Sequence, residues 1–148
     1  MKPLSKKVIQ IHAPGITAGG TDVGSGVTNY MDTKGFDYAL VDVHMSTTND
    51  TTNNPTVLQL YEADVTTSSS FATVSGSIGD TDFTVATMSA SVSSVYRFGV
   101  DLKKRKRFLK VSCYPLTTQD ITITADLFIA EELPNSASEA GVNNLVLI

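Results

Sequence analysis

Few residues in this 148-residue chain have the chemistry of a catalytic site. A Ser-His-Asp or Cys-His arrangement would have to use His12 or His44, the two histidines of the chain. His12 stands beside a Pro-Gly turn, and His44 ends a strand-like run next to Asp42 and Ser46. No nucleophile motif such as G-x-S-x-G accompanies either histidine. We therefore expect no catalytic residues and no enzyme activity, with both histidines facing solvent or satisfied by neighbours.

Two acidic pairs deserve a test as calcium ligands, namely Asp37 with Asp42 and the carboxylates of residues 79–82. A calcium loop needs several oxygen ligands at regular spacing, and residues 79–82 offer two carboxylates with no later glutamate, which favours a turn. The glycine-rich residues 19–26 contain no P-loop Lys-Ser, and no carboxylate pair is marked out as that of a glycosidase. We expect no metal site and no cofactor.

The single cysteine, Cys113, excludes an intramolecular disulfide and argues against a thiolate zinc site. It lies on the apolar side of an alternating run at residues 108–114. A reduced, inward-facing thiol is consistent with assembly in a bacterial cytosol.

The strongest charge feature is a basic cluster that holds six of the 11 lysines and arginines of the chain. Its members are Lys103, Lys104, Arg105, Lys106, Arg107 and Lys110. Outside this cluster the chain has five cations and 15 acidic residues, whereas the net charge of the whole chain is −4. We expect the cluster on a hairpin between two strands. A phosphate or nucleic-acid contact, a solvated turn without a partner and docking on an acidic protein surface are all open, and we favour docking because no aromatic platform is interleaved with the cations.

The composition predicts the elements that carry these residues. Val, Ile and Thr number 15, 8 and 19, and such β-branched residues favour strands over helices. Alternating apolar residues predict about eight strands, at 8–12, 36–45, 56–62, 71–74, 83–87, 92–102, 108–114 and 121–129. The fold class is therefore an all-β antiparallel sandwich of Greek-key or jelly-roll type. Its predicted core is Val41, Val43, Leu58, Leu60, Phe98, Val100, Leu109, Val111, Ile121, Ile123 and Leu127.

The two ends of the chain stand apart from this pattern. Residues 1–30 contain a glycine-rich stretch, and we interpret them as an extended N-terminal arm or lead-in before a single domain at 31–148. A polar loop occupies residues 46–55. The chain ends on four apolar residues, Leu145, Val146, Leu147 and Ile148, which need a partner in the chain's own sheet or in a neighbouring subunit. No run approaches the roughly 18 apolar residues of a membrane span, so we expect no membrane partner.

Three segments follow the strand that begins at Phe36, namely Thr-Val-Leu-Gln-Leu-Tyr-Glu-Ala-Asp at 56–64, Phe-x-x-Val-x-Gly at 71–76 and Lys-Arg-aromatic-Leu-x-Val at 106–111. With these segments, residues 36–130 resemble small capsid-associated proteins of tailed bacteriophages. The chain departs from that group in its longer N-terminal segment and longer loop at 46–55.

The resemblance implies a jelly-roll-like decoration, cement or minor capsid protein on the outside of a virus head, assembled in the host cytoplasm. It also implies the major capsid protein as a partner, a homotrimer, and no enzyme activity; with the acidic net charge, we expect no nucleic-acid partner. A carbohydrate-binding or receptor-binding module and a tail or neck component are the alternatives. The absence of tryptophan, with most tyrosines at strand positions that suit a core, speaks against sugar binding.

Overall fold

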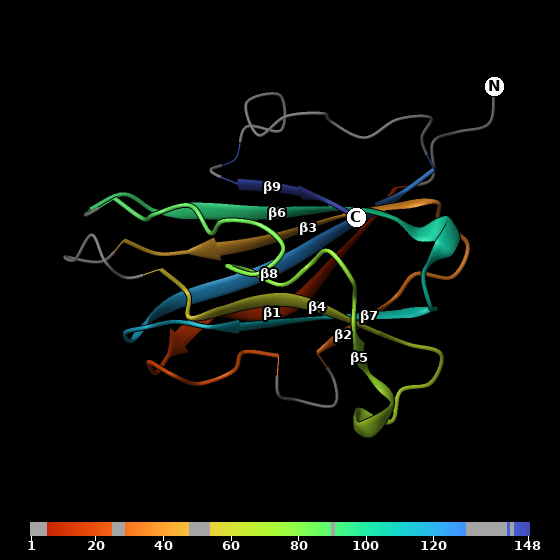
Figure 1. The fold of residues 1–148 in the computed structure, drawn as a ribbon, viewed down its shortest axis with the longest axis horizontal. Helices are drawn as coiled ribbons and strands as arrows, with labels where there is room; N and C mark the ends of the chain where they lie inside the picture. Colours follow the sequence, from red (N-terminus) through yellow and green to blue (C-terminus); the bar gives the residue numbers. More distant parts are fainter. Residues whose placement is uncertain (1–5, 25–28, 48–53, 90, 130–141, 143) are drawn as a thin grey trace.

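A computed structural model describes residues 6–24, 29–47, 54–89, 91–129, 142 and 144–148. Two sheets pack as a β-sandwich, and no α-helix occurs in these ranges (Figure 1). The five-stranded sheet contains, in order, β1 (Lys6–Thr17), β8 (Gln119–Phe128), β3 (Tyr38–Met45), β6 (Ser94–Asp101) and β9 (Asn144–Leu147). The four-stranded sheet contains β2 (Tyr30–Asp32), β7 (Phe108–Tyr114), β4 (Val57–Ala63) and β5 (Ala72–Thr73). Two 3₁₀ turns complete the list, η1 (Ser68–Ser70) and η2 (Leu102–Lys104). The all-β sandwich is thus confirmed.

The inner faces of both sheets form one hydrophobic core. All eleven residues that alternation placed in the core are at most 1% exposed. Further side chains, including Tyr96, Met31 and Met88, fill the same core. The period of two along each strand therefore predicts the buried face correctly.

The strands pair in a nested order along the chain. β1 pairs with β8, β2 with β7, β3 with β6, and β4 with β5, each time antiparallel. Between β1 and β8, every connection crosses from one sheet to the other except the one from β4 to β5. The first eight strands thus follow the path of one long hairpin folded over on itself, with β9 added at one edge.

The strand expected at residues 8–12 is longer than predicted. β1 runs as the edge strand beside β8, and its register shifts twice, on either side of His12. Such bulges let a strand pass an irregular stretch such as Pro14-Gly15 without leaving the sheet. Part of the segment that we interpreted as an arm is therefore a strand of the sandwich, while residues 1–5 and 25–28 lie outside the described ranges.

The apolar C-terminus joins the chain's own sheet. β9 runs parallel to β6, and Val146, opposite Phe98, is 8% exposed. The backbone of Ile148 extends the pairing, because its N–H donates to Gly99 and its carbonyl accepts from Asp101, both at 2.9 Å. The tail thus finds a partner in its own sheet, at β6. Contact of the tail with another subunit stays a prediction.

Residues 74–88 close one side of the core without forming the strand predicted at 83–87. One isolated bridge joins Gly79 to Phe83. The Tyr96 hydroxyl on β6 donates to the carbonyl of Ala86 at 2.9 Å, and buried Ser77 bonds to Leu60 on β4. The segment therefore links β6 of the five-stranded sheet to β4 of the four-stranded sheet. Most of the polar loop at 46–55 lies outside the described ranges.

Candidate functional site

The basic cluster lies on a crossing between the two sheets, and the expected hairpin is wrong. β6 belongs to the five-stranded sheet and β7 to the four-stranded sheet, so the cations that join them cannot form a hairpin. The crossing begins with η2, where the side chain of Asp101 accepts from the N–H of Lys103 at 3.0 Å. Leu102 is 7% exposed, and its N–H donates to the carbonyl of Asp37 at 2.8 Å. The sequence was misleading here because two adjacent strands in the chain need not be neighbours in a sheet.

Acidic residues from other elements hold the crossing in place. Arg107 donates to both carboxylate oxygens of Asp32, at 2.9 and 2.6 Å. Arg105 lies 3.9 Å from Glu62, which also accepts from the backbone N–H of Lys106 at 3.1 Å. Since Asp32 is on β2 and Glu62 on β4, the crossing is tied to two strands of the four-stranded sheet.

Aromatic rings anchor three of the cations, which corrects our expectation that no rings accompany the cluster. The contacts are Lys103 over Tyr38, Lys110 over Phe71 and Arg107 over Phe108, at 5.1, 5.9 and 4.8 Å from the ring centroids. Lys103 also donates to the Tyr38 hydroxyl at 3.3 Å, and this hydrogen bond raises the pKa of Lys103. These cations therefore have partners within the chain.

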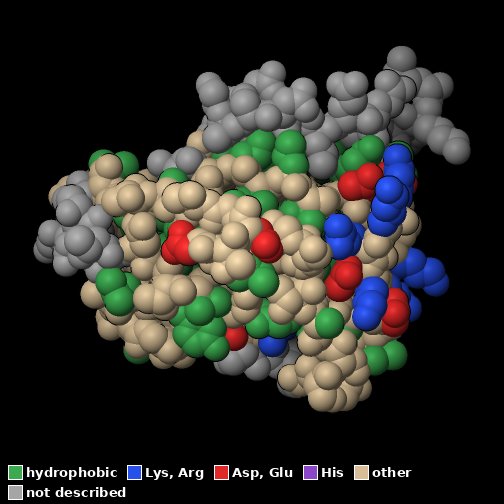
Figure 2. Space-filling model, in the orientation of Figure 1, with side chains coloured by type: hydrophobic (Ala, Val, Ile, Leu, Met, Phe, Trp, Pro, Cys, Tyr) green, Lys and Arg blue, Asp and Glu red, His purple; other side chains and the backbone are tan. Residues whose placement is uncertain are grey.

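Lys104 and Lys106 are the open members of the cluster. Both are exposed, and neither side chain has an ion-pair partner in the part of the chain that the structure describes. Figure 2 shows basic and acidic side chains gathered at the end of the sandwich where η2 lies in Figure 1. The cluster thus presents two lysines on a frame built from four anchored cations.

Sequence reasoning missed a second group, which we call the tyrosine face. It lies on the outer side of the four-stranded sheet and comprises Asp22, Gln59, Tyr61, Lys110, Ser112 and Tyr114. Gln59 on β4 stands directly opposite Ser112 on β7, and Tyr61 stands opposite Lys110. The Gln59 amide donates to the Tyr61 hydroxyl, and the Ser112 hydroxyl donates to Asp22 at 3.1 Å. The alternation of β4 and β7 already predicts that these residues face outward, but not that they meet.

A close backbone contact places Asp22 at this face. The N–H of Val23 donates to the carbonyl of Cys113 at 3.1 Å, and the N–H of Gly24 donates to Asp22 at 2.8 Å. A Cβ atom at Gly24 would overlap the carbonyl oxygen of Val111. Glycine is therefore required for the loop to lie flat against β7.

The environment of Tyr114 favours the protonated form of its hydroxyl. The charge of Asp22 raises the pKa of Tyr114, with smaller contributions from burial and from Tyr61. The Tyr114 hydroxyl thus remains a hydrogen-bond donor across the physiological pH range.

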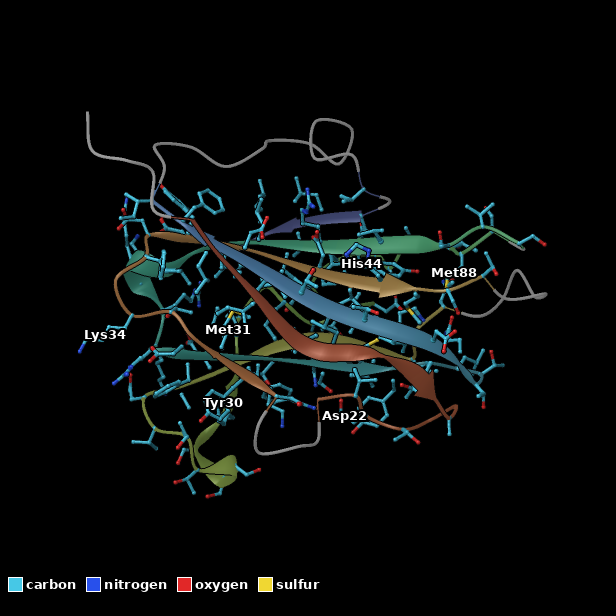
Figure 3. All side chains as sticks on the ribbon, turned by 180° about the vertical axis from the view of Figure 1, so that it is seen from behind. Asp22, Tyr30, Met31, Lys34, His44 and Met88 are labelled. Atoms are coloured by element: carbon cyan, nitrogen blue, oxygen red, sulfur yellow. The ribbon has the colours of Figure 1, made fainter. Side chains whose placement is uncertain are left out.

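Aromatic packing bounds the tyrosine face on the side of the basic crossing. Tyr30 lies on β2, opposite Lys110 of β7. Its ring makes an edge contact with Phe108 at 5.4 Å and a tilted contact with Phe71 at 6.3 Å, measured between ring centroids. We interpret this trio as a small core of its own beneath the loop that carries η1. Figure 3 shows Tyr30 and Asp22 on the same side of the molecule, whereas His44 lies over the five-stranded sheet.

The outer face of the five-stranded sheet carries a closed ion pair. Arg97 on β6 donates to both oxygens of Asp42 on β3, at 2.6 and 2.5 Å. His44 lies 4.0 Å from Asp42 and its side chain is 45% exposed. The solvent-facing interpretation of His44 is confirmed, while the side chain of His12 lies outside the description. Arg97 thus pairs with Asp42, one of the carboxylates that we considered as calcium ligands.

The other acidic pair forms a turn, as predicted. Asp80, with a φ of 59°, accepts from the N–H of Val85 at 3.0 Å, and Asp82 accepts from the N–H of Ile78 at 3.0 Å. Among the described residues, no three His, Cys, Asp or Glu side chains come together as metal ligands. Cys113 faces the core as predicted, and burial raises the pKa of its thiol to about 12.

Comparison with known proteins found no matching family model, no matching curated protein and no matching solved structure. No helix in the described ranges has the length and hydropathy of a membrane span.

Proposed function

We propose that this chain is a structural virion protein, a decoration, cement or minor capsid protein that binds the outside of a bacteriophage capsid. The nested pairing of β1 to β8 supports a jelly roll, since two sheets of four strands wound as a folded hairpin have that topology. The fifth strand, β9, is an addition at the edge. Fold alone does not assign a task, so the proposal rests on the basic end of the sandwich.

The observation that carries the proposal is the open pair Lys104 and Lys106 on a firmly held crossing. Hydrogen bonds and an ion pair hold the backbone and the neighbouring arginine, so less backbone freedom is lost when these lysines meet a partner. The rest of the chain is acidic, which leaves this end as the favoured contact for an acidic protein surface. The partner that fits is the major capsid protein.

A second acidic surface is that of another copy of this chain, and the proposed assembly is a homotrimer on the capsid surface. β1 and β9 already have partners in their own sheet, so the trimer does not depend on an exchange of strands. Leu147 remains 47% exposed at the β9 edge and offers an apolar contact to a neighbour. Light scattering on the purified chain gives the mass that tests the trimer.

Co-sedimentation with empty capsids of the same virus tests the docking end. We expect the unmodified chain to sediment with capsids, and the K104E/K106E variant to lose most of this binding at low salt. The K104R/K106R variant keeps the charge and should bind like the unmodified chain, as a matched control. Equal binding of the charge-reversed variant would overturn the docking role. Binding to isolated tails or necks but not to heads would place the protein elsewhere on the virion.

A further inference from the structure

The tyrosine face has hydrogen-bonding capacity that the chain itself does not use. In Asp22, one carboxylate oxygen accepts from Gly24 and Ser112, while no partner in the described ranges reaches the other. The same holds for the amide oxygen of Gln59 and for the hydroxyl of Tyr114. A carboxylate from the loop before β2, an amide from β4 and a phenol from β7 therefore keep free acceptors and donors on the outer side of the four-stranded sheet.

Two aromatic rings flank these polar groups. Tyr61 and Tyr114 project from neighbouring strands and are partly exposed, on either side of the opposed pair Gln59 and Ser112. This differs from our expectation that most tyrosines lie in the core, because only Tyr38 and Tyr96 are buried there. Tyrosine rings offer large, rigid apolar surfaces, while planar amide and carboxylate groups fix hydroxyl groups in defined directions.

We propose that the tyrosine face binds a neutral glycan, with sugar rings stacked on Tyr61 and Tyr114 and sugar hydroxyls bound by Gln59 and Asp22. Sugars combine an apolar ring face with a rim of hydroxyl groups, and this face offers the complement of both. The Asp22 carboxylate disfavours phosphate-bearing or acidic ligands at this end of the sheet. The open lysines Lys104 and Lys106 precede β7, whereas Tyr114 ends it, so the docking lysines and Tyr114 lie at opposite ends of this strand.

This inference goes beyond the proposed capsid role and does not depend on it. A decoration protein that docks through its basic end would carry the tyrosine face on a different side of the sandwich. Glycan binding would then attach the particle to a polysaccharide-coated surface. The two activities can be lost separately.

Affinity electrophoresis tests the proposal with five neutral polysaccharides in the gel, namely dextran, mannan, xylan, glycogen and galactan. We expect at least one to retard the unmodified chain. The Y61A/Y114A variant should lose the retardation, and calorimetry with a hexasaccharide of the retarding polymer should show at least tenfold weaker binding. Y61F keeps the ring, so it should bind more tightly than Y61A. The H44A/T124A variant alters the outer face of the other sheet and should bind normally.

Three results would overturn the inference. The first is the absence of retardation in all five gels, and the second is unchanged binding by Y61A/Y114A. The third is tight binding of a 20-nucleotide oligothymidine that Y61A/Y114A abolishes, which would make the face a nucleic-acid site. If the melting temperature shows that Y61A/Y114A is unfolded, the milder Q59A variant tests the same surface. Normal capsid co-sedimentation by a folded Y61A/Y114A variant would separate the two functions.

Discussion

The two sheets of the sandwich are alike on their inner faces and unlike on their outer faces. Each contributes alternating aliphatic side chains to one shared core. On the outer face of the five-stranded sheet, Asp42 and Arg97 satisfy each other. On the outer face of the four-stranded sheet, Gln59, Tyr114 and Asp22 keep unused hydrogen-bonding capacity. This difference makes the outer face of the four-stranded sheet, rather than that of the five-stranded sheet, the candidate for a binding role.

Strand register explains why the outer faces differ. In the five-stranded sheet, Asp42 stands directly opposite Arg97, so opposite charges meet at the distance where cross-strand pairs interact. In the four-stranded sheet, Gln59 stands opposite Ser112, and these short neutral groups instead reach Tyr61 and Asp22. A shift of the β3–β6 register by two residues would keep the core but separate Asp42 from Arg97, and the same shift between β4 and β7 would separate Gln59 from Ser112.

The largest effect should come from the inner faces, and it should be the same for both sheets. Ile123 and Leu60 are each fully buried, one in β8 and one in β4. We expect I123A and L60A each to lower the free energy of unfolding by about 2–4 kcal/mol, because each leaves a cavity in one common core. Urea denaturation measures both. A loss below about 1 kcal/mol for one variant alone would show that the sheets do not share the core equally.

A smaller effect should separate the two outer faces. Asp42 and Arg97 have side chains that are 14% and 20% exposed, so R97A leaves a largely buried carboxylate without its partner. We expect R97A to cost about 2 kcal/mol, between the values for buried and surface ion pairs. K110A, on the tyrosine face, loses one ring contact and should cost about 0.5 kcal/mol.

Urea denaturation of the two variants decides whether the outer faces differ in stability as in chemistry. R97K serves as the control, since it keeps the charge but not the two-pronged geometry, and it should fall between R97A and the unmodified chain. Equal losses for R97A and K110A would contradict the comparison.

The sequence predicted the inner faces of the sheets correctly, but it did not predict every strand. Every core residue that was predicted from the alternation is buried, because a buried face needs an apolar side chain at each second position. It failed at residues 83–87, where the carboxylates of Asp80 and Asp82 bind backbone N–H groups and hold the chain in a turn. Local side-chain bonds there compete with strand pairing, and alternation does not register them.

The candidate sites depended on information that is not local. The basic cluster was visible as a run of charges, but the choice between a hairpin and a crossing depends on which strands share a sheet. The outward direction of Gln59, Tyr61 and Tyr114 follows from alternation, whereas their proximity follows from the pairing of β4 with β7. Asp22 reaches them because Gly24 allows close contact with β7. A glycine-rich stretch by itself indicates flexibility as readily as close packing.

Each inner face also holds one ionisable group that must stay neutral. Burial raises the pKa of Cys113 in β7 from 9.0 to about 12, and burial likewise raises that of Tyr96 in β6 above its ordinary 10.0. Above these ordinary values, the unfolded chain loses protons that the folded chain retains. The contribution of these two neutral groups to the free energy of unfolding is therefore fully present below pH 9 and is lost as the pH rises toward 12.

Denaturation at pH 7 to 11 separates the contributions of the two groups. C113A should flatten the decline that begins near pH 9, and Y96F should flatten only the part above pH 10. Both variants lose some stability at pH 7, so the slope with pH is the quantity to compare. An identical slope for C113A and the unmodified chain would show that the thiol does not contribute to the pH dependence.

The smallest effect should come from the crossing that joins the sheets. Lys104 and Lys106 have no ion-pair partner in the described ranges, so K104A/K106A should change the free energy of unfolding by less than about 0.5 kcal/mol. Arg107 and Asp32 are 46% and 39% exposed, and water screens their attraction, so R107A should lower the free energy of unfolding only slightly. Added salt should shrink the R107A loss, since a Debye length of about 3 Å at 1 M salt screens an exposed pair. A large loss for K104A/K106A would mean that these lysines support the fold, and their exposure at the basic end would no longer favour a docking role.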